Sequence, residues 1–510
     1  MVAHRYNVST LLDANVEAER GDKVAVIAGD EQVTYGELLS RVEAMASAYR
    51  ALGVVREQRV LLVLDDTAAF PVAFFGAIRT GAVPVPVNPY SVPTDFPYFI
   101  ADSYARVVVT DSSRAETLRP ALAGPDGAAR LITVDQGVDG ALLLGDLLAE
   151  HAGAGLPPAD THRDDMAFWL YSSGSTGRPK GVVHLHRAIP YTCQAYADQV
   201  LGIVADDVTF SSTKLFHAYG MGNNLTFPYW AGATTVLMEG KPTPGSVLDT
   251  IERHHPSLFF SAPTLYNAIL KTPGAADRDL SSVRRCVSAA ESLPAEVFRR
   301  WRDTFGVTIL DGIGSTEMLH IYCSNAQGDL RPGSSGKAVP GYELELRDLD
   351  GALTPPGEVG NLLVRGGSAL AAYWHQQEKT RHSVRGEWFF TGDRYRLDAD
   401  GFYWYEGRTD DMMKVSGLWV SPVEIEGTLL EHPGVYEAAV VGVDVEGLNR
   451  IKAFVIRTPD HAGEDLADEL AQWCKSRLAR HKFPHLVEFV DDLPKTTTGK
   501  IQRFKLRAPA

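Results

Sequence analysis

A short stretch rich in glycine and hydroxyl residues carries the clearest chemistry in the sequence. Residues 171–181 read YSSGSTGRPKG and follow an apolar run at 166–170 that predicts a strand. Glycines let backbone N–H groups converge on an anion, hydroxyl groups add donors, and a lysine adds positive charge. A flexible surface turn is the alternative, but the ordered combination with Pro179, Lys180 and Gly181 favours a phosphate-binding loop. The loop lacks the Gly-Lys-Ser/Thr spacing of a Walker A motif.

Three later side chains suit the rest of a nucleotide. Glu317 follows two hydroxyl residues and is a carboxylate able to hold Mg²⁺ beside a triphosphate. Asp393 follows a Thr-Gly turn, where a carboxylate can accept hydrogen bonds from both ribose hydroxyls, and Arg408 could share the ribose or a phosphate. Taken singly, these residues would be read as a helix cap, an Asx turn and a surface ion pair.

Lys500 is the candidate catalytic residue. Attack of a carboxylate on an α-phosphate brings two anions together, and a cation that touches both stabilises the developing charge. The whole tail is basic, and C-terminal lysines are commonly solvated. The frame PKTTTGK at 494–500 separates Lys500 from them.

Several motifs together resemble the acyl-adenylate-forming superfamily, which contains acyl-CoA synthetases, adenylation domains of peptide synthetases and luciferases. The glycine-rich loop, GSTE at 314–317, TGD at 391–393, GRTDD at 407–411 and PKTTTGK at 494–500 occur in the order and spacing of that family. The resemblance covers essentially the whole chain. It implies ATP and Mg²⁺ as cofactors, with Glu317 and Thr176 at the metal, Asp393 and Arg408 at the ribose, and Asp410 as a hinge.

The resemblance also assigns the remaining nucleotide contacts. The family usually carries an aromatic residue that stacks on adenine where this chain has Ile313, which leaves an apolar slab against the base. The ATP or AMP contacts implied are Ser172, Ser173, Gly174, Ser175, Thr176, Gly177, Lys180, Ala290, Glu291, Ser292, Asp311, Gly312, Ile313, Gly314, Ser315, Thr316, Asp393, Arg408 and Lys500.

Residues 214–224, KLFHAYGMGNN, indicate which class of carboxylic acid the protein binds. This segment holds no acid to pair with the ammonium of an α-amino acid, so an amino acid is a poor substrate. The segment and residues 314–321 resemble benzoate–CoA ligases, which implies an aryl pocket lined by Ala218, Tyr219, Gly220, His320 and Ile321. His217 falls at the gate between acid and thiol, where phenylalanine is expected. Cys323 stands where a bulkier aliphatic residue is expected, so a hydroxy- or aminobenzoate would fit.

The acyl acceptor is most simply free coenzyme A. No carrier-protein domain is fused, and Gly417 and Trp419 resemble the family's pantetheine tunnel. A stand-alone aryl-adenylating enzyme that loads a carrier protein is the first alternative. A non-catalytic nucleotide-binding protein is the second, disfavoured because Lys500, Glu317 and Thr176 are all present.

The elements that must position these residues read as α/β. Short β-branched runs at 60–64, 83–87 and 107–110 alternate with helical segments, as in a parallel sheet covered by helices. Thr34 and Glu37 predict a capping box that starts a helix ended by Gly53. Residues 343–347 and 361–365 alternate like solvent-facing strands of a β-rich subdomain that begins near Gly341. We expect an adenylation domain at 1–409 and a mobile α+β domain at 410–510.

Composition excludes several classes of protein. The 510 residues are 45% hydrophobic and 22% charged, in the ordinary globular range. A formal net charge of −15 argues against a nucleic-acid partner. The four cysteines show no zinc or disulfide spacing. Without a bilayer-length apolar run or a charged, apolar leader, the sequence predicts no membrane contact and a cytoplasmic protein.

Overall fold

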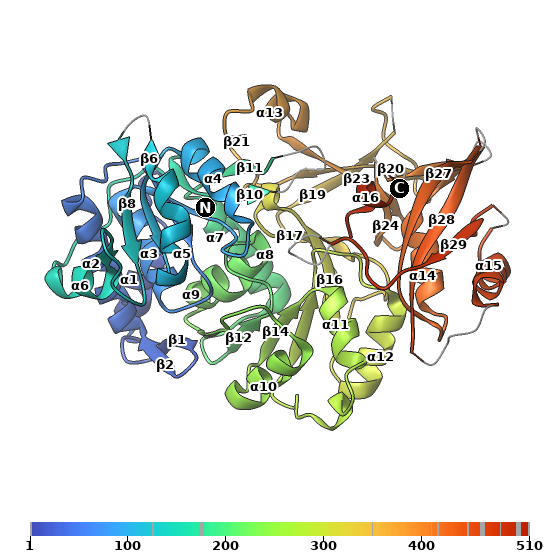
Figure 1. The fold of residues 1–510 in the computed structure, drawn as a ribbon, viewed down its shortest axis with the longest axis horizontal. Coiled ribbons are helices and arrows are strands. Elements are labelled where there is room, and N and C mark those ends of the chain that lie inside the picture. The colour runs from blue at the N-terminus through green and yellow to red at the C-terminus, as the bar shows by residue number, and fades with distance from the viewer. Residues whose placement is uncertain are drawn as a thin grey trace.

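The computed structural model describes residues 3–124, 127–172, 178–348, 350–409, 411–415, 418–445, 448–459, 465–479, 481–495 and 501–507. The chain is α/β, with a large N-terminal domain and a small C-terminal domain at opposite ends of the molecule (Figure 1). None of the helices in these ranges is long and apolar enough to cross a membrane.

The first sheet of the large domain is parallel and has helices against both faces. Its strands, in spatial order, are β4 (Val83–Pro86), β3 (Arg59–Val63), β5 (Ala105–Thr110), β8 (Arg130–Thr133) and β9 (Leu142–Leu143). Val60 and Leu62 pack toward α2 (Tyr35–Ala51) and α3 (Ala69–Thr80), whereas Leu61 and Val63 pack toward α4 (Phe96–Ser103) and α5 (Ser112–Leu118). Burial on both faces explains the uninterrupted apolar runs in the sequence.

The start of α2 confirms the predicted capping box. The Thr34 hydroxyl accepts from the backbone N–H of Glu37, and the Glu37 carboxylate accepts from the N–H of Thr34. Two orphan donors of the first turn are thereby satisfied. Gly53, with φ of 82°, follows the helix end as predicted.

The second sheet of the large domain is mixed. Its spatial order is β18 (Lys337–Ala338), β17 (Ile321–Ser324), β16 (Ile309–Gly314), β15 (Arg285–Ser288), β14 (Leu258–Ser261), β12 (Val208–Ser211), β13 (Thr234–Leu237), β1 (Val24–Ala28) and β2 (Glu31–Thr34). The helices α10 (Pro244–His254), α11 (Pro263–Leu270) and α12 (Ala295–Phe305) pack on one face. Pairing is parallel from β1 through β16 and antiparallel at both edges.

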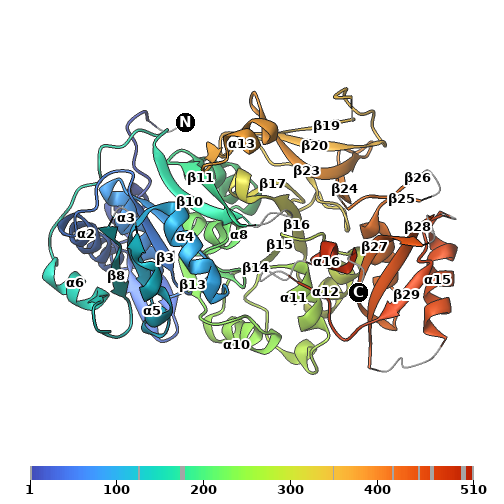
Figure 2. The same ribbon diagram turned by 45° about the horizontal axis from the view of Figure 1, so that its top comes forward.

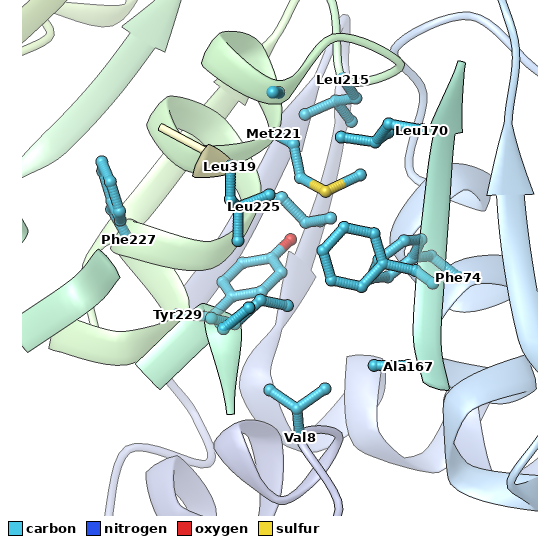
Figure 3. Packing of buried hydrophobic residues seen from close by; sticks show 14 of the residues in the cluster. Val8, Phe74, Ala167, Leu170, Leu215, Met221, Leu225, Phe227, Tyr229 and Leu319 are labelled. Atoms are coloured by element: carbon cyan, nitrogen blue, oxygen red, sulfur yellow. The ribbon is translucent and has the colours of Figure 1, made fainter. Parts of the chain in front are cut away.

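The main core lies between these two sheets. It is crossed by α8 (Ala218–Met221), the π-helical turn η4 (Gly222–Thr226) and α9 (Phe227–Ala231), which bring Met221, Leu225 and Tyr229 against Phe74 of α3 (Figure 3). Residues of α1 (Thr10–Glu17), α6 (Leu144–Glu150), α7 (Ala188–Thr192) and the π-helical η3 (Cys193–Leu201) belong to the same core. A helical segment thus runs through the interior between two sheets.

Three smaller sheets complete the large domain, and the smallest is the pair β6 (Ala123–Gly124) and β7 (Gly127–Ala128). The strands β10 (Met166–Ser172), β11 (Lys180–Leu185) and β21 (Ala372–Tyr373) form one of them. The β-rich subdomain contains β19 (Glu343–Arg347), β20 (Val359–Arg365), β23 (Trp388–Leu397), β22 (Val384–Arg385) and β24 (Tyr403–Arg408), with α13 (Gln377–Ser383) beside it. The predicted solvent exposure of residues 361–365 was wrong. Residues of β20 from Gly360 to Val364 are buried, and Leu362 and Val364 belong to the main core.

The C-terminal domain has its own core. It is built from β25 (Met413–Val415), β26 (Leu418–Val420), α14 (Pro422–Leu430), β27 (Val435–Val445), β28 (Leu448–Arg457), α15 (Leu466–Arg477), β29 (Leu486–Phe489) and α16 (Arg503–Arg507). It meets the large domain where the Lys271 ammonium donates to the Tyr436 carbonyl at 2.7 Å. Figure 2 shows the same end-to-end arrangement after a 45° turn.

Candidate functional site

The glycine-rich stretch joins two antiparallel strands. Ser172 at the end of β10 pairs with Lys180 at the start of β11. The predicted strand before the loop is therefore confirmed, and the arm after it is a strand as well. Five predicted phosphate contacts, Ser173, Gly174, Ser175, Thr176 and Gly177, lie outside the described residues.

Helix α4 holds both arms of this hairpin. The Tyr98 hydroxyl donates to the Pro179 carbonyl at 2.6 Å, and the Tyr171 hydroxyl donates to the Asp102 carboxylate at 2.6 Å. The Trp374 indole N–H donates to the Asp102 carbonyl at 2.9 Å. Contacts on both sides fix where the chain leaves β10 and enters β11.

Glu317 contacts several polar groups where β10 ends and β11 begins. One carboxylate oxygen lies 3.3 Å from the Lys180 ammonium and accepts from the Tyr373 hydroxyl at 2.9 Å and the Ser172 hydroxyl at 3.5 Å. Burial alone would raise the Glu317 pKa, but Lys180 and Tyr373 outweigh it, so the pKa lies below its usual value. The site therefore presents an ionised carboxylate and a hydroxyl, an oxygen donor set that fits Mg²⁺.

The backbone around Glu317 is held from several directions. Ser315 caps the short 3₁₀ turn η6 (Thr316–Met318) by accepting from the Met318 N–H, and the His184 ring contacts the Thr316 carbonyl at 2.8 Å. A Cβ on Gly314 would lie 2.5 Å from the His320 carbonyl oxygen, so only glycine fits there. The Ser-Thr-Glu stretch is thus a capped turn that also presents a buried carboxylate.

Asp393 and Arg408 face each other across β23 and β24. The guanidinium donates to the Asp393 carboxylate at 3.0 Å and to the Thr391 carbonyl at 3.0 Å. Gly392 has φ of 75°, and a Cβ there would lie 2.9 Å from the Arg408 guanidinium. The two predicted ribose contacts are therefore adjacent. Burial raises the pKa of Tyr322, and the charges of Asp393 and Glu317 raise it further.

Six of the predicted ATP or AMP contacts stand at neighbouring strand ends. Ala290, Glu291 and Ser292 follow β15, and Asp311, Gly312 and Ile313 lie on β16, which is parallel to it. Ala290 has φ of 77°, an uncommon backbone conformation for a residue with a Cβ. Glu291 accepts from the Thr264 hydroxyl at 2.7 Å, and burial raises the pKa of Asp311 well above its usual range.

The predicted aryl residues also come together. Tyr219 of α8 and His320 lie with ring centroids 5.6 Å apart, and both are buried. Ala218, Gly220 and Ile321 are buried beside them. The Tyr219 hydroxyl donates to the Val287 carbonyl at 3.0 Å, so the ring edge is fixed. Burial lowers the pKa of His320 to about 3, which keeps its imidazole neutral at pH 7.

The two residues that differ from the expected pocket have different surroundings. His217 precedes α8, its ring lies 4.3 Å from that of Phe216, and burial lowers its pKa to about 4. Cys323 is buried on β17 with its sulfur 3.4 Å from the Ser335 carbonyl oxygen. His217 is therefore a neutral ring just before α8. The Cys323 thiol contacts the segment that connects β17 to β18.

Asp410, Gly417 and Lys500, together with Thr176, lie outside the described residues, and for Trp419 only the backbone pairing with Lys414 in β25 and β26 is described. Sequence reasoning also missed a residue. Tyr373 contacts both Glu317 and Lys180, whose ammonium is 4.3 Å from its ring centroid, but it stands in β21 without a local motif.

Comparison with known proteins identifies the family of the chain. Residues 12–374 match the AMP-binding enzyme family, and residues 424–500 match the AMP-binding enzyme C-terminal domain. A benzoate–CoA ligase of Thauera aromatica is 46% identical over 99% of this chain and 97% of the relative. A 4-hydroxybenzoate–CoA/benzoate–CoA ligase of Rhodopseudomonas palustris is 44% identical over 98% and 94%. The crystal structure of the anthranilate CoA ligase AuaEII with anthranoyl-AMP has a TM-score of 0.95 and 42% identity, covering 99% and 97%.

Proposed function

Because this chain belongs to the AMP-binding enzyme family, we propose that it is an AMP-forming aryl-acid–CoA ligase. Its substrates are an aromatic carboxylic acid, benzoate or a hydroxy- or aminobenzoate, together with ATP and coenzyme A. The observation that carries the proposal is the cluster of Glu317, Lys180 and Ser172 at the glycine-rich hairpin, in the same domain as the buried rings of Tyr219 and His320.

In the first half-reaction, a carboxylate oxygen of the acid attacks the α-phosphorus of ATP. The bond from that phosphorus to the bridging oxygen breaks, and pyrophosphate leaves with the electron pair. Lys180 and the glycine-rich loop hold the phosphates, and Lys500 stabilises the charge that develops between acid and phosphate. Glu317, with Thr176, would hold Mg²⁺, which supplies positive charge beside the phosphates when bound.

In the second half-reaction, the sulfur of coenzyme A attacks the acyl carbonyl. The bond between the carbonyl carbon and the AMP oxygen breaks, AMP leaves with the electron pair, and the thiol proton is released. We assign the pantetheine tunnel to Gly417 and Trp419. Residues 410–510 would rotate about Asp410 against residues 1–409, and His217 would gate the path between acid and thiol.

The deciding experiment is acid-dependent release of pyrophosphate across substituted benzoates, with and without coenzyme A. The proposal requires both pyrophosphate release and a thioester product. Pyrophosphate release without formation of acyl-CoA, together with formation of a thioester on an added carrier protein, would favour the stand-alone adenylating enzyme. Nucleotide binding without pyrophosphate release would favour a non-catalytic protein. The cytoplasmic location expected from the sequence stays a prediction, to be checked by fractionation of cells that express the chain.

A further inference from the structure

A buried cluster of charged groups lies beside the segment that leads into α8. The Lys214 ammonium is 2.9 Å from the Asp65 carboxylate and also donates to the Met238 carbonyl. The other oxygen of Asp65 accepts from the Gly240 N–H at 2.7 Å and from the Tyr90 hydroxyl. These residues follow β12, β3, β13 and β4, so the cluster joins the carboxyl ends of parallel strands from the first and the second sheet.

Asp66 adds a second attachment to the same segment. Its side chain is 1% exposed, and one carboxylate oxygen accepts from the Leu215 N–H at 3.0 Å. The other oxygen has no hydrogen-bond partner among the described residues. Consecutive aspartates thus hold consecutive residues, Asp65 through the side chain of Lys214 and Asp66 through the backbone of Leu215.

The backbone held in this way is the surface on which α8 rests. A Cβ on Gly220 would lie 2.2 Å from the Lys214 carbonyl oxygen and 2.3 Å from that of Thr213. The His217 N–H donates to the Lys214 carbonyl at 3.0 Å just before α8 begins. A shift of residues 213–215 would therefore move Ala218 and Tyr219 with it.

The same turn is connected to His320. The Ser211 hydroxyl donates to the Thr213 carbonyl at 3.1 Å and accepts from the Asn223 amide at 3.3 Å. The Asn223 carbonyl oxygen faces the His320 Nε2 at 3.1 Å. Residues 211–215 are therefore connected both to α8, through close packing, and to His320, through hydrogen bonds.

We propose that Asp66 is a positioning residue for the aryl-acid pocket. It fixes the backbone of residues 213–215 and through it the placement of Tyr219, while the nucleotide contacts at Glu317, Asp393 and the hairpin are held by other groups. This inference rests on the proposed function. A purely stabilising role for Asp66 would affect binding of both substrates. A positioning role should affect binding of the aryl acid and leave binding of ATP unchanged.

The test compares Asp66→Ala with Asp66→Asn in the full chain. The alanine removes the acceptor for Leu215, whereas the asparagine oxygen keeps it without the charge. Asp207→Ala is the matched control, since Asp207 is also buried and accepts a backbone N–H, from Val204 at 2.9 Å, but it stands before β12 at the opposite end of the strand. The KM for benzoate, the KM for ATP and kcat are measured by pyrophosphate release, with Tm for each protein.

We expect Asp66→Ala to raise the KM for benzoate about 10-fold or more, because small displacements of positioning groups are costly, while the KM for ATP stays within about twofold. Asp66→Asn should restore the benzoate KM to within about threefold of the parent. Asp207→Ala should lower Tm without separating the two KM values. Equal changes in both KM values, no change in either, or failure of the asparagine to restore the benzoate KM would overturn the proposal.

A parent without acid-dependent pyrophosphate release would instead contradict the proposed function. If Asp66→Ala does not fold, the KM for benzoate and the KM for ATP are compared in Lys214→Met, which disrupts the contact between Lys214 and Asp65. It removes the contacts with Asp65 and Met238, and the proposal again requires a selective rise in the benzoate KM. A Lys214→Met protein whose two KM values stay in their parental ratio would overturn it.

Discussion

The Lys180 ammonium lies 3.3 Å from the Glu317 carboxylate, and the Tyr373 hydroxyl donates to the same carboxylate oxygen at 2.9 Å. The two charged groups come from different strands and turns, β11 and η6, and meet beside the arms of the glycine-rich hairpin. Since each offsets the other's burial, removing either leaves an unpaired charge in a largely buried site.

Replacing Glu317 should separate charge from hydrogen bonding at this site. Glu317→Gln keeps the shape but loses the charge, and we expect it to slow adenylation by about 10²-fold, the scale of one preorganised electrostatic contact. Tyr373→Phe removes only a neutral donor and should cost about 10-fold or less. Acid-dependent exchange of pyrophosphate into ATP measures both. A larger loss of adenylation in Tyr373→Phe than in Glu317→Gln would contradict the assignment of the Glu317 charge to adenylation.

Local patterns in the sequence were sufficient for much of the fold. Thr34 and Glu37 stand three residues apart, so their capping box could be predicted without tertiary information. The burial of β20 could not, because it depends on core residues far away in the sequence that pack against Leu362 and Val364. The same holds for Tyr373, which is 56 residues from Glu317, and for Asp66, which is 149 residues from Leu215. Such contacts leave no periodic or motif signal in either partner.

Stability should fall in mild acid because of buried histidines. Burial lowers the pKa of His184, His186 and His217 to about 4 and that of His320 to about 3. Their unfolded pKa is about 6.5, so between these values the unfolded chain binds more protons and the free energy of unfolding decreases as pH falls.

The histidine contribution can be isolated with one substitution. His184→Gln keeps a side-chain amide that can donate to the Thr316 carbonyl but cannot take up the proton, so Tm should depend less on pH between about 6.5 and 4. His382→Gln, at an exposed histidine, is the control and should leave the slope unchanged. Identical slopes in the two variants would show that His184 does not contribute.

Lys500→Ala should abolish adenylation selectively. The charge of Lys500 is needed only when carboxylate meets phosphate, so we expect a loss of about 10²-fold or more in pyrophosphate release. Thioester formation from a supplied acyl adenylate should be retained. Lys505→Ala, in the same basic tail, is the control. Near-parental pyrophosphate release by Lys500→Ala would contradict the assignment.

Gly417→Leu should have the opposite effect. A leucine side chain would fill the proposed pantetheine tunnel, so thioester formation should stop while adenylation continues. Both half-reactions are measured separately, with Tm as a check on folding. A parallel loss of both in a folded variant would argue against a tunnel at this position.

His217 and Cys323 should differ in their effect on the choice of acid. We expect the parent to accept a benzoate with a small polar substituent at least as well as benzoate, because a missing buried hydrogen bond costs roughly 1–3 kcal/mol and a methyl-sized void about 1 kcal/mol. His217 stands beside α8 with a neutral ring, whereas the Cys323 thiol already contacts the Ser335 carbonyl. His217→Phe should therefore change selectivity more than Cys323→Leu. The measurement is kcat/KM for benzoate, 2-hydroxybenzoate, 2-aminobenzoate and 4-hydroxybenzoate in the three proteins. A parent that strongly prefers benzoate, with a ranking that neither substitution alters, would show that these two positions do not read the ring.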